Sequence, residues 1–319
     1  MIKAFFGNRT FVLFLLPFFV AGYALLHTFF PIEYLNFEKV NLGFFGLYEE
    51  NIFTVILSGV LVFTTAIIVN NVFNRNEFRE KNTYLPSLIY VVLASFSEAY
   101  YHLNGSVISS LLIALAVIQL FRLNQNEDGR KDVFNAAFLF GLAACFYPVM
   151  FLLFPLLFIL VWVLRPFVMR ESALMVVGFI LPIVYAGVFA YYMGYELDNK
   201  LFSPSGVIEN RNLYMILGSL VAVLLLAMIS PLLLKISQSG IRLKKLFRII
   251  FLMTIAFSVV FLFEMILMNK QGGFCLMILP LSALLTYAFG DRELRPFPTF
   301  IFYLIFIISV GKFFYGFNF

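Results

Sequence analysis

A carboxylate and an imidazole stand four residues apart where the third apolar segment of the chain ends. They are Glu98 and His102, in the stretch SFSEAYYHLNG that begins at Ser95. Residues four apart share one face of a helix, so the sequence predicts that these two side chains lie side by side. Such a pair can hold a proton or orient a ligand. The alternative is structural: a helix end at the membrane surface, with Tyr100 and Tyr101 as aromatic anchors.

Other ionisable side chains also lie inside apolar segments, each in the third of its segment that is predicted to face outward. They are His27, Glu264 and Lys312. Charged groups within a bilayer usually face the interior of a bundle or a wet cavity. Their one-sided placement therefore predicts a polar pocket that opens outward. The alternative is again structural, because a side chain one turn from the surface can extend to the headgroups at modest cost.

The same residues indicate neither a metal nor a cofactor. The histidines and glutamates lack the spacing of a metal site such as HExxH. The cysteines, Cys145 and Cys275, lie in separate apolar runs, so they form no disulfide framework and are expected to be buried.

The composition is that of a membrane protein. Of the 319 residues, 62% are hydrophobic and only 12% are charged, whereas soluble domains carry about 25% charged residues. Such a chain cannot cover a water-facing surface, and membrane lipids are its expected surroundings. The net charge of +5 is distributed loop by loop and indicates no nucleic-acid partner.

Apolar segments of membrane-spanning length predict an all-α fold, a polytopic transmembrane helical bundle with about 11 spans. The predicted spans are 10–30, 53–73, 85–101, 106–122, 132–146, 147–165, 173–193, 212–236, 247–268, 273–290 and 297–317. No long hydrophilic stretch remains, so residues 1–319 are predicted to form a single integral membrane domain with no separate soluble domain. The first span is longer than the apolar core of a signal peptide, ~7–15 residues, and is expected to remain uncleaved.

Basic residues predict the orientation of the chain. Seventeen of the 22 Lys and Arg residues fall on one set of segments between the spans, and such residues gather on the cytoplasmic side. The N-terminus is therefore expected inside, and the C-terminus outside, the cytoplasmic (inner) membrane of a bacterium. On the inner side, residues 237–248 are an expected contact for anionic lipids.

Basic loops flank the nearly continuous apolar stretch 133–165, so the chain must return to the side from which it came. As a helix this stretch reaches about 48 Å, which is too short for two crossings of a ~30 Å core. We expect one short or re-entrant hairpin that turns near Phe146–Pro148. Irregular backbone at this depth is tolerated only when it is buried in protein or lines a cavity, so the hairpin is expected in the interior.

Two outer loops are long enough to carry a site. Residues 31–51 hold four glutamates and one lysine among aromatic residues, which is typical of an amphipathic segment along the interface. Residues 194–212 form the next longest loop, with Arg211 near its end. Both loops can equally be solvated connections.

The order of these elements resembles the polytopic GT-C glycosyltransferases, which use polyprenyl-phosphate sugars at the outer face of the membrane. Glu33, in FFPIEYL, stands three residues after the first span, where that family has a catalytic acid that is commonly an aspartate. The stretch 134–166 is similar to the family's hairpin with glycine and proline, and NKQGGFCLMILPLSALL (269–285) is similar to its late segment. The phenylalanine-rich composition also resembles uncharacterised multi-pass membrane proteins of Bacteroidota, which implies no function.

The resemblance implies a mechanism. Glu33 is the candidate base that removes the proton of an acceptor hydroxyl, while Glu98 and Glu264 orient a sugar or a basic partner. Fixed cations stabilise the phosphate leaving group, because they lower the barrier where charge develops. The candidates for this role are His102, Arg211 and Lys270.

Two other classes of protein fit the sequence. The first is a non-catalytic scaffold or anchor subunit of a cell-envelope complex for secretion, motility or polysaccharide assembly, with other envelope membrane proteins as partners. It predicts that substitution of Glu33, Glu98 and Glu264 is tolerated. The second is a transporter or lipid flippase, a class that prefers binding groups near the bilayer midplane and paired broken helices. Here the charges lie outward and one hairpin is broken.

Overall fold

The computed structural model describes residues 2–7, 10–30, 39–49, 51–97, 100–124, 128–194, 211–268, 270–290 and 294–314. Most of these residues are helical, in agreement with the predicted all-α fold. The helices are α1 (Ile2–Phe6), α2 (Leu16–Phe29), α3 (Ile52–Arg75), α4 (Leu85–Ala94), α5 (Gly105–Leu123), α6 (Arg130–Phe146), α7 (Phe154–Leu164), α8 (Met169–Met193), α9 (Arg211–Gln238), α10 (Ile241–Phe263), α11 (Gly273–Leu285) and α12 (Pro296–Gly311). Short 3-10 turns cover Thr10–Leu15, Gly43–Phe45, Pro148–Leu153 and Thr286–Phe289, and a π-helical turn covers Glu264–Met268.

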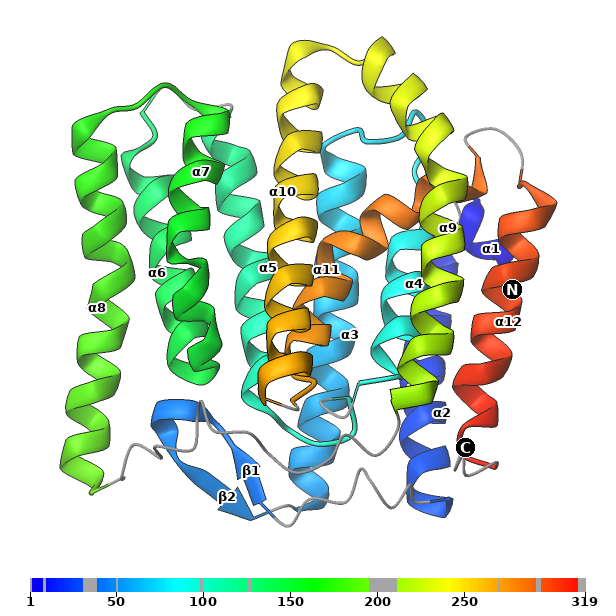
Figure 1. The fold of residues 1–319 in the computed structure, drawn as a ribbon, viewed down its shortest axis with the longest axis horizontal. Helices are drawn as coiled ribbons and strands as arrows, with labels where there is room; N and C mark the ends of the chain where they lie inside the picture. The colour runs from blue at the N-terminus through cyan, green and yellow to red at the C-terminus, as the bar shows by residue number, and fades with distance from the viewer. Residues whose placement is uncertain are drawn as a thin grey trace.

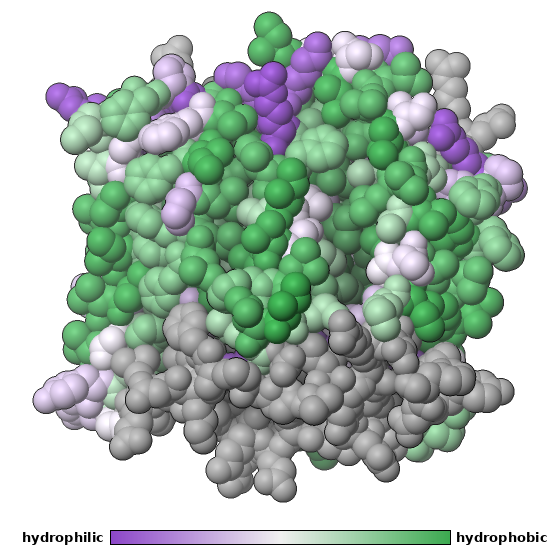
Figure 2. Space-filling view, in the orientation of Figure 1, coloured by the Kyte–Doolittle hydropathy of each residue, from purple (hydrophilic) through white to green (hydrophobic). Residues whose placement is uncertain are grey.

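The helices run between two ends of the molecule (Figure 1). One end carries the connections that follow α3, α7 and α9, and the other carries the connections that follow α4, α6 and α10 together with a small β-hairpin. We name the first end cytoplasmic and the second end outer, after the predicted orientation. Apolar side chains cover the middle of the face shown in Figure 2, and hydrophilic side chains gather at its cytoplasmic end.

Six helices in the described part of the chain are long and apolar enough to cross a membrane. They are Phe11–Phe29, Ile52–Arg75, Gly105–Leu123, Met169–Met193, Tyr214–Gln238 and Ile241–Met268. Shorter apolar helices cover Leu85–Ala94, Pro148–Leu164, Gly273–Phe289 and Pro296–Gly311. The chain is therefore a multi-pass helical membrane protein. Each predicted span contains a helix, but the number of crossings stays a prediction, because the shorter helices reach only part of a ~30 Å core.

Two of the shorter helices, α4 and α11, form the centre of the bundle. All ten residues of α4 are buried, and α4 packs on α3 and α11. Ten helical residues are only about 15 Å long, so the predicted span 85–101 is wrong at its outer end. The helix ends at Ala94, and the next three residues (95–97) are buried without being helical. Irregular backbone within a membrane protein requires such burial.

The predicted hairpin near 133–165 turns where it was expected. Helix α6 ends at Phe146, Tyr147 is extended, and Pro148 starts the 3-10 turn that leads into α7. Helix α6 packs closely on α8, because Gly141 lies against the Phe179 backbone and Gly178 lies against the Phe134 backbone. These glycines hold the two helices together.

The described part of the loop 31–51 forms a small hairpin. Strands β1 (Lys39–Asn41) and β2 (Leu47–Glu49) pair antiparallel. Between them, Gly43 has a φ of +65°, and a Cβ there would lie 2.7 Å from the carbonyl oxygen of Phe146. The ring of Phe45 stacks on that of Phe146, with centroids 4.6 Å apart. The hairpin is therefore anchored on the outer end of α6.

Candidate functional site

The centre of the candidate site is the non-helical segment Ser95–Ser97, directly after α4. The ammonium group of Lys312 donates a hydrogen bond to the Ser95 carbonyl oxygen. The Tyr214 hydroxyl donates to the Phe96 carbonyl oxygen at 2.9 Å, and the Ser97 hydroxyl lies 3.0 Å from the Cys275 sulfur. Three residues in a row thus bind side chains from the end of α12 (Lys312, directly after the helix), from α9 and from α11.

Basic side chains gather on one side of this segment. The His27 ring stacks on that of Tyr101 with centroids 4.7 Å apart, and it meets the His102 ring edge to face at 5.4 Å. The Lys312 ammonium lies 5.0 Å from the centre of the Tyr101 ring. Lys312 and His102 are 4% and 6% exposed, so this basic cluster (His27, His102 and Lys312 around Tyr101) lies inside the outer end of the bundle.

A buried carboxylate lies near the other side of the segment. Glu264 is 0% exposed and begins the π-helical turn, a distortion that is frequent at functional sites. One of its oxygens accepts a hydrogen bond from the Tyr147 hydroxyl, and the other accepts one from the Gly273 backbone N–H at 2.6 Å. Two donors thus compensate for its burial, as a buried carboxylate requires.

Glycines make this close approach possible. A Cβ at Gly273 would lie 2.6 Å from the Glu264 carboxylate, and a Cβ at Gly272 would lie 2.6 Å from the Tyr147 hydroxyl. Close packing therefore explains the two glycines of the motif QGG (271–273). Its first residue, Gln271, has its side-chain oxygen 2.5 Å from the Tyr214 hydroxyl, whose single proton is shared between this oxygen and the Phe96 carbonyl oxygen; Tyr214 thus connects the acidic side to the segment after α4.

Opposite charges meet the ends of the two central helices. The Glu264 carboxylate lies at the N-terminus of α11, where the helix dipole is positive. Lys312 lies at the C-terminal end of α4, where the dipole is negative. At the cytoplasmic end, the Arg79 guanidinium donates to the Gly290 carbonyl oxygen, just after α11 and its final turn. Charges buried in the bundle thus stabilise helix ends that water does not reach.

The predicted site residues are placed in part. Glu264, His102 and Lys270 lie at the outer end, and the Lys270 backbone N–H donates to the Glu264 carbonyl oxygen at 3.2 Å. Glu33, Glu98 and the side chain of Arg211 lie outside the described residues.

One prediction about the stretch 95–105 is wrong, and another is not tested. Helix α4 ends at Ala94, before His102, and Glu98 lies outside the described residues, so the pairing of Glu98 with His102 stays a prediction. Tyr100 and Tyr101 are not interfacial anchors, because they are 2% and 1% exposed. The Tyr101 hydroxyl instead donates to the Ser95 carbonyl oxygen at 2.7 Å.

Some residues of the site gave no clear signal in the sequence. Tyr147 and Tyr214 read as ordinary aromatic residues of apolar segments, and Ser95 and Ser97 as small residues in a span. The expected burial of Cys145 and Cys275 is confirmed.

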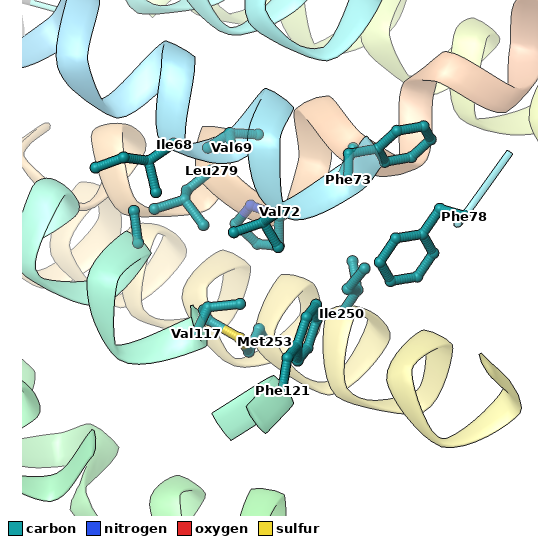
Figure 3. A pocket seen from close by; sticks show the side chains of 13 residues that line it. Ile68, Val69, Val72, Phe73, Phe78, Val117, Phe121, Ile250, Met253 and Leu279 are labelled. Atoms are coloured by element: carbon teal, nitrogen blue, oxygen red, sulfur yellow. The ribbon is translucent and has the colours of Figure 1, made fainter. Parts of the chain in front are cut away.

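A separate cavity lies in the cytoplasmic half of the bundle (Figure 3). It is about 30 Å³ in volume, and apolar side chains of α3, α5, α10 and α11 line it, among them Val72, Val117 and Met253. It has room for about one water molecule and holds none of the predicted site residues. Among the described residues, no group of three His, Cys, Asp or Glu side chains could hold a metal ion.

Fold and hydropathy define the class: a multi-pass helical membrane protein with a buried polar cluster at one end. Within this class, residues 29–316 match the family described as "Family of unknown function (DUF6427)", and the chain belongs to that family. No curated protein and no solved structure matches the chain. The match includes His102, Glu264 and Lys312.

Proposed function

We propose that this protein is a GT-C-like glycosyltransferase that moves a sugar from a polyprenyl-phosphate carrier at the outer face of the membrane. The observation that carries the proposal is a basic cluster held on the buried segment Ser95–Ser97, where the side chains of Lys312 and Tyr101 both donate to the Ser95 carbonyl oxygen. A buried carboxylate, Glu264, binds the start of α11, the helix whose Cys275 contacts Ser97. Transfer from a phosphate carrier needs an acid or base for the acceptor and cations for the leaving phosphate.

The proposed roles of the residues come from the sequence, and the structure adds contacts for Glu264 and Lys270. Glu33, in the outer loop, is the proposed base. His102, Arg211 and Lys270 are the proposed partners of the phosphate. Glu264 has both oxygens occupied by donors, so it acts by positioning: it holds the turn that presents Lys270 at the outer end. Glu98 remains a candidate for orienting the sugar.

The folded outer hairpin supports an enzyme. Its turn at Gly43 packs against the end of α6, and Phe45 contacts both Phe146 and Phe189. A loop that is fixed on the bundle can hold an acceptor in register with the bundle, and such positioning contributes several kcal/mol to a transfer reaction.

The test is mass spectrometry of the lipids and proteins that purify with the chain from its own host in mild detergent. We expect a polyprenyl-phosphate sugar in the wild-type sample, and a higher ratio of sugar-loaded to unloaded carrier in Glu33→Gln. Arg211→Ala should lose the lipid. The matched control is Glu80→Gln, because Glu80 is an exposed cytoplasmic residue paired with Lys235.

Other results would contradict the transferase. A stoichiometric protein partner without such a lipid would favour the scaffold subunit. Carrier bound in the same loaded form in wild type and Glu33→Gln would show binding without transfer.

A transporter or flippase is the second candidate, and one observation favours it. Helices α4 and α11 are short and buried, and their outer ends meet Lys312 and Glu264. Discontinuous helices whose ends face opposite charges are typical of secondary transporters. For this candidate, reconstituted vesicles should move the carrier lipid between leaflets, and Glu33→Gln should leave that movement unchanged.

A further inference from the structure

We infer that the basic cluster binds the phosphate group of a lipid that reaches it from the membrane between α2 and α12. The inference deepens the proposed function, on which it rests for the identity of the lipid, but a binding experiment tests it without any transfer reaction. The cluster lies at the outer end, separate from the Glu264 turn.

Lys312 supplies the first argument. Its ammonium group has three donors, yet the described part of the chain offers it one acceptor, the Ser95 carbonyl oxygen. The faces of Phe96, Tyr101 and Phe313 lie 5.0–5.1 Å away and favour a cation. A charge that is 4% exposed is costly unless it is paired and hydrogen-bonded. Within the described residues no carboxylate forms an ion pair with Lys312.

His27 supplies the second argument. Its Nε2 atom is buried and has no hydrogen-bond partner among the described residues. A buried polar atom without a partner costs about 1–3 kcal/mol. The stack on Tyr101 fixes the ring, so the imidazole cannot turn away without losing that contact. The His102 ring lies 5.4 Å from the His27 ring, and Lys312 lies against the same Tyr101 ring. A phosphate oxygen would accept a hydrogen bond from His27 and supply the negative charge that Lys312 lacks.

The surroundings of the cluster favour access from the lipid. Helices α2 and α12 are joined at Tyr23 and Ser309, whose hydroxyls lie 2.6 Å apart. Toward the outer end, the rings of Phe30 and Phe314 are 4.9 Å apart, and they are 46% and 55% exposed. These aromatic side chains offer an apolar surface for an isoprenoid or acyl chain, with the phosphate directed inward to Lys312.

The experiment measures binding of defined lipids to the full-length protein in mild detergent by native mass spectrometry. The probes are polyprenyl phosphate, phosphatidylglycerol and, as a lipid without phosphate, diacylglycerol. We expect polyprenyl phosphate to bind with one molecule per chain and diacylglycerol to bind much more weakly. Lys312→Met and His27→Phe should each weaken phosphate binding by about tenfold. The phenylalanine retains a ring that stacks on Tyr101 and removes both nitrogens.

The matched control is Lys235→Met, because it removes a lysine at the cytoplasmic end, where Lys235 pairs with Glu80. It should bind the probes as the wild type does. If His27→Phe and Lys312→Met bind within about twofold of wild type, or if diacylglycerol binds equally well, the inference is overturned. His27→Phe keeps the test decisive if Lys312→Met does not fold.

Two further results matter. The first distinguishes polyprenyl phosphate from membrane phospholipids as the ligand, and the second distinguishes a lipid site from an ion pair within the protein. Equal binding of phosphatidylglycerol and polyprenyl phosphate would assign the site to membrane phospholipids, so the inference would stand and the transferase would lose support. Glu98 is the rival partner of Lys312, because it follows Ser97 directly in the sequence. If Glu98→Gln and Lys312→Met lower the melting temperature equally and the double variant lowers it no further, an internal ion pair explains Lys312. That result would overturn the inference.

Discussion

At the scale of single residues, buried polar groups inside the bundle are stabilised by hydrogen bonds from specific partners. Glu264 receives one donor from a side chain and one from the backbone. The Tyr147 hydroxyl is the donor that can be removed without changing the shape of the site. Buried polar groups that lose a partner cost more than the net value of one hydrogen bond, so this contact should contribute measurably to stability.

The substitution Tyr147→Phe should lower the free energy of unfolding by about 1–3 kcal/mol. The reason is that the buried carboxylate of Glu264 keeps only the Gly273 donor. Thermal unfolding of the purified protein in detergent measures the change. The matched control is Tyr192→Phe, because Tyr192 is 84% exposed and its change should stay within about 0.5 kcal/mol. Equal stability of the two variants would contradict the role of the hydroxyl.

The substitution Gly273→Ala should also lower the free energy of unfolding by about 1–3 kcal/mol. Its Cβ would lie 2.6 Å from the Glu264 carboxylate and 3.1 Å from the Phe261 Cα, so the turn must move. Chemical denaturation measures the loss. Gly218→Ala is the control, because nothing lies within 4 Å of a Cβ there and alanine favours a helix. A stable Gly273→Ala variant would show that this turn is loose.

At the scale of helices, the sequence predicted the long elements well. Predicted spans 53–73 and 212–236 correspond to α3 and α9, because uniform apolar runs with polar ends define a membrane helix. The span 85–101 failed because hydrophobicity reports depth in the membrane and does not say whether a buried backbone is helical. Ser95 ends α4, and the interior groups that hold the following backbone, such as Lys312, are far away in the sequence.

The site was predicted less completely than the helices, for the same reason. Charges in the outer parts of spans were found, since a charge in an apolar run is visible in the sequence. Their partners were not found, because Tyr147 and Glu264 are 117 residues apart and periodicity along one segment carries no information on such contacts. The pairing of Glu98 with His102 was predicted from helical spacing, and it stays a prediction because Glu98 lies outside the described residues.

The substitution Gly141→Ala should separate α6 from α8 and lower the free energy of unfolding by about 1–3 kcal/mol. A Cβ at Gly141 would overlap the Phe179 carbonyl oxygen and lie 2.8 Å from the Pro182 ring. Small residues at helix crossings allow this close approach in membranes. Thermal unfolding measures the loss, with Gly187→Ala as the control, because α8 leaves open space around a Cβ at that position. Equal melting temperatures of Gly141→Ala and Gly187→Ala would mean that α6 and α8 can accommodate the extra methyl group where they cross.

At the scale of the whole molecule, the two ends differ in chemistry. The cytoplasmic end carries most of the basic residues, including the start of α10 with Arg242, Lys244 and Lys245. The outer end carries the hairpin and the buried polar cluster. Because the proposed function requires the cluster to face outward, it depends on the orientation of the chain.

Single-cysteine labelling tests this orientation. A cysteine at Gln238, an exposed residue at the end of α9, should react with a membrane-impermeant maleimide only after the cells are permeabilised. A cysteine at Ser205, in the hydrophilic segment 195–210, should react in intact cells. The parent chain is the control, because Cys145 and Cys275 are buried and should stay unlabelled. The opposite pattern, with Gln238→Cys labelled from outside, would turn the cluster toward the cytoplasm. Lipid carriers at the outer face could then not reach Lys312, so the proposed transferase would fall, whereas the phosphate site would take its lipid from the inner leaflet.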